Sequence, residues 1–280
     1  MRVLHIEHFN NGWMNPVLAF GLSFIGSVLG LRCAVHAKTS STPLGWLIAA
    51  AVALGGAAIW VMHFTAMLGF SVDRVPIRYD VPLTLLSAVI AIVVVLIGLT
   101  IVTGGGNERV TLPFGGAITG LGVAAMHYLG MWAMRAQIVV EYDPALAALS
   151  LVIAVVAATA ALWFMLHVRG LLMTISAALV MGIAVCGMHY TAMAAMRVHH
   201  GAATTEVDGV TPVQLLLPLI ATVSLVIAGL VIVVGLAELE VAGENRSASE
   251  LLLRTEGGVM SSTDPATLAD SGKQWPRLPN

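Results

Sequence analysis

Three six-residue segments combine histidine with methionine in otherwise apolar surroundings. They read MHFTAM at 62–67, MHYLGM at 126–131 and MHYTAM at 188–193. In each copy one methionine precedes the histidine directly and a second follows it four residues later. Side chains four residues apart share one face of an α-helix, so the histidine and the later methionine can act together. Imidazole nitrogen with thioether sulfur is a soft ligand set that favours copper, especially Cu(I).

The candidate copper ligands are the histidine and both methionines of each copy, namely His63, His127, His189, Met62, Met67, Met126, Met131, Met188 and Met193. Three further sulfur-bearing residues are additional candidates because they share the histidine faces: Met134, Met196 and Cys186. Methionine at helical spacing is also ordinary core packing, and a single buried histidine can be satisfied by a backbone carbonyl. Three ionisable side chains in equivalent apolar positions nevertheless favour a functional site.

The composition requires a membrane to hold these segments. The 280 residues are 58% hydrophobic and only 10% charged, whereas soluble domains carry about 25% charged residues. A net charge of −2 gives no basic surface for nucleic acid. A membrane-spanning helix needs about 20 mostly apolar residues. The fold class expected is therefore an all-α integral membrane protein with seven transmembrane helices, at 16–35, 44–70, 82–103, 113–134, 144–166, 171–196 and 212–237.

The chain repeats internally. The three histidines are spaced by 64 and 62 residues, and the segment YDVPLTLLSAVIAIVV (79–94) resembles YDPALAALSLVIAVVA (142–157). The unit is a helix pair repeated three times in the same orientation, with the last apolar segment as one extra helix. Parallel repeats of this kind commonly build a membrane fold around an internal site. Since each motif lies toward the end of its helix, we expect the three imidazoles to meet at one depth.

Charge predicts how the chain is oriented. Basic residues in the loops after the first, third and fifth apolar segments are Arg32, Lys38, Arg109 and Arg169, and the tail adds more. Cytoplasmic loops carry an excess of Lys and Arg. We therefore expect residues 1–13 to form an outer N-terminal segment, 14–237 the membrane domain, and 238–280 a cytoplasmic, largely disordered tail. The motifs then lie near the outer face.

At the motif residues the sequence resembles the MHYT-domain family of bacterial integral membrane sensor proteins. Met188-His189-Tyr190-Thr191 reproduces the family signature, whereas residues 62–65 read MHFT and 126–129 read MHYL. The resemblance covers residues 14 to about 237. It implies copper bound near the outer face by the motif histidines and methionines, and it implies sensing of a diatomic gas: oxygen, CO or NO.

The resemblance also bears on output and partners. Relatives join this membrane domain to cyclic-di-nucleotide enzymes or to histidine kinases, and residues 238–280 are too few for such a domain. We therefore expect no enzymatic activity of the chain itself. The leading prediction is a sensor in the lipid bilayer that signals through an unidentified cytoplasmic partner. Two alternatives stay open: copper handling or delivery at the membrane, and a haem-binding redox protein with two of the histidines as axial ligands.

Overall fold

A computed structural model describes residues 6–7, 10, 12–73, 75–200 and 208–261. The expected outer segment 1–13 is thus described only in part, and residues 262–280 of the expected tail lie outside the described residues. The chain divides into two units, Met1–Val231 and Ile232–Asn280. All candidate ligands belong to the first unit.

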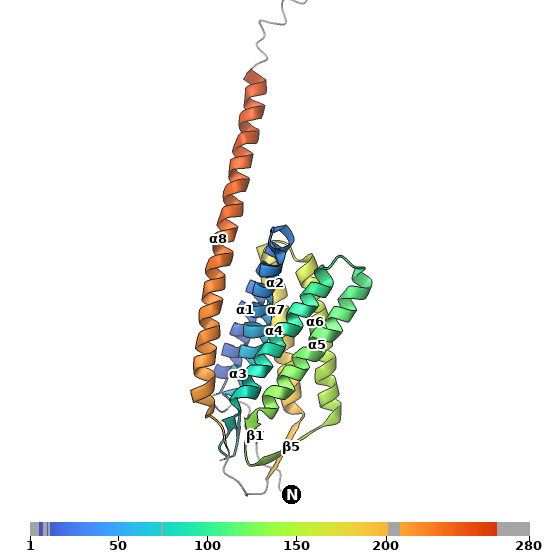
Figure 1. Cartoon of the computed structure of the whole chain (residues 1–280), viewed down its shortest axis with the longest axis vertical. Helices are drawn as coiled ribbons and strands as arrows, with labels where there is room; N and C mark the ends of the chain where they lie inside the picture. The colour runs from blue at the N-terminus through green and yellow to red at the C-terminus, as the bar shows by residue number, and fades with distance from the viewer. Residues whose placement is uncertain (1–5, 8–9, 11, 74, 201–207, 262–280) are drawn as a thin grey trace, which may run out of the picture. The chain divides into compact units, whose positions relative to one another are not determined.

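In the described part of the chain, seven helices are long and apolar enough to cross a membrane. The second of these spans, Pro43–Met67, is composed of three consecutive helical segments. In chain order the helices are α1 (Met14–Thr39), α2 (Pro43–Ala51), η1 (Val52–Val61), α3 (Met62–Met67), α4 (Val81–Thr103), α5 (Glu108–Trp132), α6 (Pro144–His167), α7 (Leu171–Ala194) and α8 (Pro212–Ser261) (Figure 1). The all-α fold with seven membrane-spanning helices is therefore confirmed.

The first six spans pack in chain order as a closed ring. α1 packs against η1, η1 against α4, α4 against α5, α5 against α6, α6 against α7, and α7 against α1 again. The three motif-bearing spans end in α3, α5 and α7, so they alternate around this ring. Alternation places the three motifs in equivalent positions, from which they can face a common centre.

Small residues allow the helices of the ring to approach closely. A β-carbon at Gly55 would lie 2.6 Å from the carbonyl oxygen of Ala91 in α4. A β-carbon at Gly120 would lie 2.5 Å from the α-carbon of Val155 in α6. Close backbone contact of this kind is the usual way in which membrane helices associate, because lipid provides no hydrophobic drive between them.

The middle of the second span is a π-helix, which the sequence pattern did not predict. η1 runs over ten residues, Val52–Val61, immediately before the first motif. Longer runs of π-helix are rare, and short ones occur frequently at functional sites. The apolar run VALGGAAIWV has no feature that separates π from α geometry, although its glycine pair permits close packing or bending. The π-helical geometry ends at Val61, directly before α3 begins.

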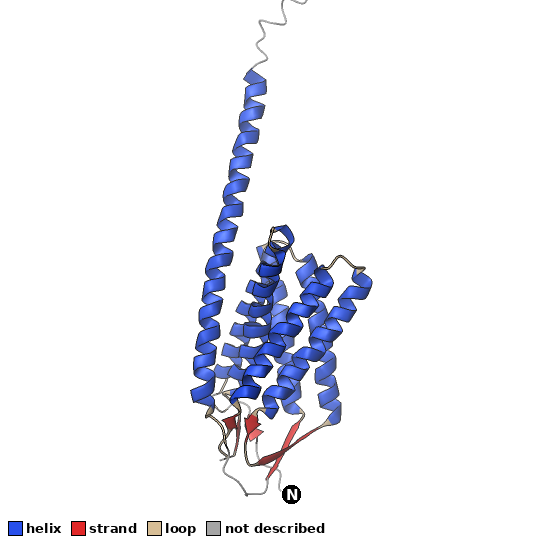
Figure 2. Ribbon diagram, viewed as in Figure 1, coloured by secondary structure: helices blue, strands red, loops and turns tan. Residues whose placement is uncertain are grey.

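Three short antiparallel strand pairs lie together at the end of the bundle where the motif helices finish (Figure 2). β1 (Ile6–Glu7) pairs with β2 (Ser71–Val72), β3 (Arg78–Tyr79) with β4 (Met134–Arg135), and β5 (Ile138–Tyr142) with β6 (Met196–His200). β3 and β4 follow the first and second motif helices, and β6 follows the third. The pairs therefore tie the ends of the motif helices together and help to fix their relative depth.

Two aspartates repeat the same anchoring role at this end. Asp80 caps α4 by accepting from the Leu83 N–H at 3.1 Å, and its other oxygen accepts from Arg135 at 3.0 Å. Asp143 caps α6 in the same way and accepts from Arg197 at 2.9 Å. Each arginine lies eight residues after a motif histidine. The ion pairs thus join the end of each of these motif helices to the start of a neighbouring helix.

Residues 238–261 differ locally from the expected tail. We expected residues 238–280 to be largely disordered, and α8 instead continues through 238–261 to Ser261. Alanine, leucine, glutamate and arginine recur in this stretch, and these are strong helix formers. The polar composition predicted exposure to water, but it does not by itself end a helix.

The repeated caps predict how stability depends on pH. The pKa of the Asp80 carboxyl is held below its ordinary value, first by the Leu83 N–H and then by the Arg135 guanidinium. The ionised carboxylate therefore stabilises the fold above its ordinary pKa of about 4, and this stabilisation is lost as the pH falls through the lowered pKa. Asp80→Asn keeps the cap acceptor and removes the charge.

We expect the wild-type protein in detergent to unfold at a higher temperature than Asp80→Asn at neutral pH. We also expect this difference in unfolding temperature to disappear in acid. Thermal unfolding of both proteins across a pH series would measure it. A difference in unfolding temperature that stays constant at every pH would show that the charge of Asp80 contributes nothing to the stability of the fold.

Candidate metal centre

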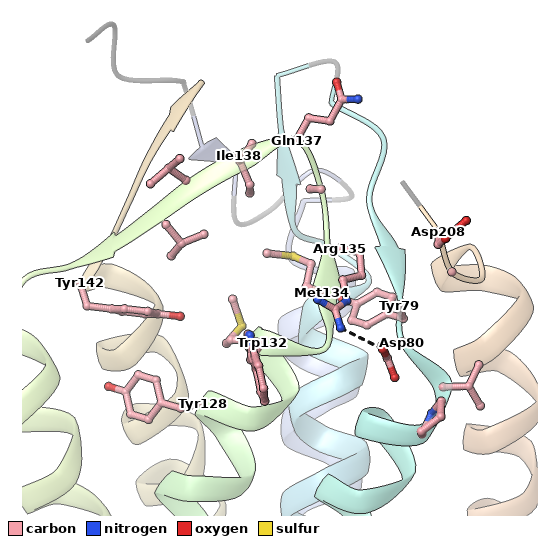
Figure 3. Close-up of a pocket in the computed structure, with 17 residues that line it drawn as sticks. Tyr79, Asp80, Tyr128, Trp132, Met134, Arg135, Gln137, Ile138, Tyr142 and Asp208 are labelled. Atoms are coloured by element: carbon pink, nitrogen blue, oxygen red, sulfur yellow. Dashed lines mark hydrogen bonds and ion pairs between the residues drawn. The ribbon is translucent and has the colours of Figure 1, made fainter. Parts of the chain in front are cut away.

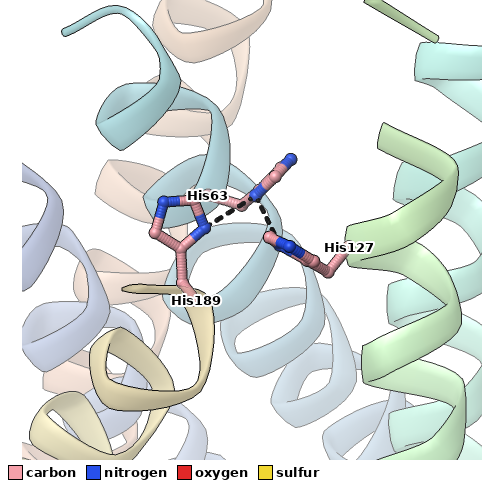
Figure 4. A group of neighbouring side chains, drawn as sticks. All are labelled: His63, His127 and His189. Atoms are coloured by element: carbon pink, nitrogen blue, oxygen red, sulfur yellow. Dashed lines mark hydrogen bonds between the residues drawn. The ribbon is translucent and has the colours of Figure 1, made fainter. Parts of the chain in front are cut away.

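The three motif histidines meet in the interior of the helix ring. His63 lies between the other two, and its Nδ1 atom is 3.0 Å from Nδ1 of His189 and 3.1 Å from Nδ1 of His127 (Figure 4). The ring centroids are 4.8, 5.0 and 5.2 Å apart. All three side chains are buried, with 1%, 1% and 2% of their surface exposed. Equivalent positions in three repeats have thus become one cluster, which we call the histidine cluster.

The cluster presents nitrogen atoms that hydrogen bonds among its members cannot fully satisfy. A neutral imidazole carries one N–H and one lone-pair nitrogen. Nδ1 of His63 faces two other Nδ1 atoms, yet it can donate to only one of them. The Nε2 atoms of His63 and His127 are buried without a hydrogen-bond partner among the described residues. Buried polar atoms in this state are rare in folded proteins.

A cation would resolve this excess of lone pairs. One nitrogen from each ring lies within 4.8 Å of the others, which is close enough for a single metal ion to contact all three. Neutral imidazole is a common ligand of zinc, copper, iron and nickel. The three histidines are the one such group of His, Cys, Asp or Glu side chains found in the part of the chain that the structure describes. The donor set therefore fits a transition metal and offers no carboxylate for magnesium or calcium.

Aromatic rings hold the imidazoles in orientation. Each histidine meets the following residue edge-on: His63 meets Phe64 at 4.6 Å, His127 meets Tyr128 at 5.1 Å, and His189 meets Tyr190 at 4.9 Å between centroids. The hydroxyls of Tyr128 and Ser150 are hydrogen-bonded at 2.8 Å. Aromatic neighbours of this kind restrict rotation of the imidazoles and keep water away from the cluster.

The motif methionines are all buried, but they lie in different surroundings. Met62 packs against Ala19 and Ala66, with Cys186 and Tyr190 beside them. Met188 lines a small internal cavity. The remaining candidates Met67, Met126, Met131, Met134, Met193 and Met196 are also buried. The three histidines form a group with metal-ligand spacing. Metal ligation by the sulfur atoms stays a prediction.

A hollow of about 1110 Å³ lies between the ends of α4 and α5 and the strands beyond them (Figure 3). Met131 of the second motif and Met134 just after it line the hollow, together with Tyr128 and the ion pair between Asp80 and Arg135. Met131 follows His127 by one helical turn, and Tyr128 touches the His127 ring. The hollow therefore reaches toward the histidine cluster from the strand end of the bundle.

Two residues that support the cluster were not predicted. Gly130 in α5 packs closely against His63. A β-carbon at Gly130 would lie 2.7 Å from the Nε2 atom of His63. Asn15 in α1 is buried and donates its side-chain N–H to the Thr65 carbonyl in α3 at 3.0 Å. The motif contained a signal for Gly130, because the third residue after each histidine is small: Ala66, Gly130 and Ala192. At Gly130 the space that a side chain would occupy is filled by the imidazole of His63.

The contact at Gly130 leads to a direct test of this packing. Gly130→Ala would force His63 and Phe64 to shift, because the new methyl group would also lie 3.2 Å from the Phe64 ring. Overpacking of this kind costs about 1–3 kcal/mol of the free energy of unfolding. We expect a lower midpoint of thermal unfolding for the purified variant in detergent.

Gly187→Ala is the matched control. Gly187 lies in α7 two residues before His189, and a β-carbon there would meet nothing within 4 Å. Alanine is the better helix former, so this variant should be as stable as the wild type or more so. Equal effects of the two substitutions would contradict the close contact between Gly130 and His63.

Comparison with curated proteins identifies several bacterial signalling proteins as relatives. The bifunctional diguanylate cyclase/cyclic di-GMP phosphodiesterase MucR of Pseudomonas aeruginosa is 44% identical over 157 residues, which cover 54% of this chain and 23% of MucR. The cyclic di-GMP phosphodiesterase NbdA of the same organism is 37% identical over 147 residues, covering 50% of this chain and 19% of NbdA. The signaling protein YkoW of Bacillus subtilis is 31% identical over 194 residues, covering 66% and 24%. In each case this chain spans about a quarter or less of the relative's length. No solved structure matches the chain significantly.

The family comparison defines the repeats. The sequence model of the MHYT family, described as a bacterial signalling protein N-terminal repeat, matches residues 56–114, 120–178 and 182–253. Each match begins in a motif helix and continues into the following helix, so α1 is the helix outside this repeat frame rather than α8. The threefold repetition itself is the one expected from the sequence. The matches cover well over half of the chain, which therefore belongs to the MHYT family of bacterial signalling proteins.

Proposed function

We propose that this protein is a membrane sensor that holds copper at the histidine cluster and responds to a diatomic gas or to redox state. The observation that carries the proposal is the convergence of His63, His127 and His189 through their Nδ1 atoms. Membership of a signalling family supports a sensory role. The output would pass to a signalling partner, and the enzyme names of MucR and NbdA make cyclic di-GMP turnover the first output to examine.

Copper is favoured by the chemistry around the cluster. The site combines three imidazoles with buried methionines on the same helices, and this soft set suits copper better than zinc, which rarely takes methionine. Copper would supply a centre that binds a diatomic gas or changes oxidation state. The protein side chains would hold that centre, shield it from water and limit the access of other molecules to it.

The haem alternative fits the geometry less well. Two axial histidines must stand on opposite faces of a macrocycle that separates their rings. The three rings of the histidine cluster lie 4.8 to 5.2 Å apart and are mutually in contact. That spacing leaves no room for a macrocycle between any two of them.

Signal transfer would use the helices that carry the histidines. A change of ligand at the cluster shifts His63, which lies on α3 directly after the π-helical segment η1. η1 in turn packs closely on α4 through Gly55. A sensor needs two arrangements with different ligand affinity. We propose that rewinding of η1 between π and α geometry is the element that distinguishes them.

The hollow at the strand end of the bundle supports copper capture or delivery as a second function. Met131 and Met134 line the hollow. Met131 lies on the histidine side of α5, and Met134 follows this helix as the first residue of β4. Thioether sulfur at an entrance would take Cu(I) from a donor and pass it toward His127. The rate of copper loading separates the two functions, because Met131→Leu would slow delivery while the histidines retain the bound ion.

We also propose that the strand end faces outward and that the C-terminal end of the chain lies in the cytoplasm. The basic residues Arg32, Lys38, Arg109 and Arg169 lie toward the opposite ends of the helices or in the connections there, and an excess of Lys and Arg is typical of the cytoplasmic side. In a variant without its natural cysteines, Gln137→Cys should react with an impermeant thiol reagent on intact cells and Arg169→Cys should not. The reverse pattern would overturn this orientation.

Loss of single histidines tests copper binding. We expect His63→Ala, His127→Ala and His189→Ala each to bind copper at least about 100-fold more weakly, since loss of a supporting contact alone commonly costs 10–100-fold. Metal analysis and competition with a copper chelator would measure this on protein purified in detergent.

His167→Ala is the matched control for those variants. His167 lies in α6, is 41% exposed, and stacks on Trp163 outside the cluster. This variant should bind copper like the wild type. Full copper retention by all three cluster variants, with their folds intact, would leave the histidines with a structural role only.

A further inference from the structure

A second, smaller cavity lies one helical turn inward from the histidine cluster. It has a volume of about 60 Å³. Its lining includes Ile59, Val123 and Val185, which precede His63, His127 and His189 by four residues each. Residues four apart share a helix face and differ in height by about 6 Å. The cavity is therefore aligned with the cluster on the side away from the strands.

Short side chains create this space. α6 contributes a face of alanines, including Ala154 and Ala158, where larger residues would fill the interior. The remaining lining is almost entirely aliphatic or thioether. Empty volume in a packed interior costs stability because its lining loses contacts. A cavity retained beneath a buried polar cluster therefore calls for an occupant.

The cavity also contains one unsatisfied polar group. Ser27 of α1 lines it and is fully buried, and its hydroxyl makes no hydrogen bond with any described residue. Serine in a helix normally bonds to a carbonyl of the preceding turn. Here its O–H stays available to donate to a molecule inside the cavity.

Size and polarity restrict the occupant. A site for one water needs roughly 10–15 Å³ on this measure, so the cavity admits a molecule of a few atoms. Drug-sized ligands need about 300 Å³ or more. Cavities with apolar walls stay dry and take up apolar molecules such as xenon. A small gas that dissolves in the bilayer meets all these conditions, and Ser27 can donate one hydrogen bond to it.

We infer that this cavity is a docking site for a diatomic gas, placed so that the gas contacts all three motif helices directly beneath the histidines. The inference rests on the proposed sensor function, for which it supplies the place where the gas collects. A gas molecule in the cavity contacts Ile59, Val123 and Val185 together. Its binding therefore affects the spacing of the three helices that carry the cluster.

Xenon is the probe, because it binds apolar cavities without needing a metal. We expect saturable xenon binding by the purified protein in nanodiscs, measured by xenon NMR, and loss of that binding in Ala158→Leu. Ala160→Leu makes the same change on the same helix at a residue that does not line the cavity, and it should bind xenon normally. Ala154→Val is a second filling variant that adds less volume, should Ala158→Leu fold poorly.

Copper content measured on the same samples separates the two proposals. Xenon binding that Ala158→Leu abolishes supports the docking site, whether or not the wild type holds copper. A wild type that holds copper but shows no saturable xenon binding overturns the docking site and leaves the metal centre intact. Equal xenon binding by the wild type and both filling variants would also overturn it.

Discussion

The structure depends on how three imidazoles are accommodated in a region without water. Each brings a lone-pair nitrogen that must be satisfied, and an unsatisfied buried polar group costs about 1–3 kcal/mol. His63 cannot donate to both of its neighbours through one nitrogen, so hydrogen bonding among the three rings is incomplete. A shared cation would resolve this shortage. The remaining features of the bundle can be understood as what is needed to bring the rings to one point and keep them there.

Those features repeat with the motif. Asp80 and Asp143 start two helices and bind the arginines that follow the second and third motifs, which fixes the strand end of the bundle. The small residue three positions after His127, Gly130, leaves room for the ring of His63. The ring of six spans places the motif helices at alternating positions. The site is thus built by the repeat as a whole, with the hollow at the strand end on one side of the histidines and the apolar cavity on the other.

Much of this could be predicted from the sequence, and the exceptions have physical reasons. Length and hydropathy determined the seven spans, and the spacing of the three histidines predicted that they share one depth. The span ends shifted by a few residues, as at Met67 and Ala194, because an apolar stretch can leave the helix without changing composition. The π-helix before His63 was missed since helical period does not distinguish it from an α-helix. Packing places Met62, Met131 and Met188 in three different environments, and copper ligation by the methionines stays a prediction.

The central claim is that the imidazoles of His63, His127 and His189 jointly ligate copper. X-ray absorption spectroscopy of the copper-loaded, purified protein tests it most directly, because imidazole ligands produce a characteristic scattering pattern beyond the first coordination shell. The account predicts scattering from several imidazoles, with a sulfur contribution if motif methionines complete the site. A copper spectrum without imidazole scattering would contradict it.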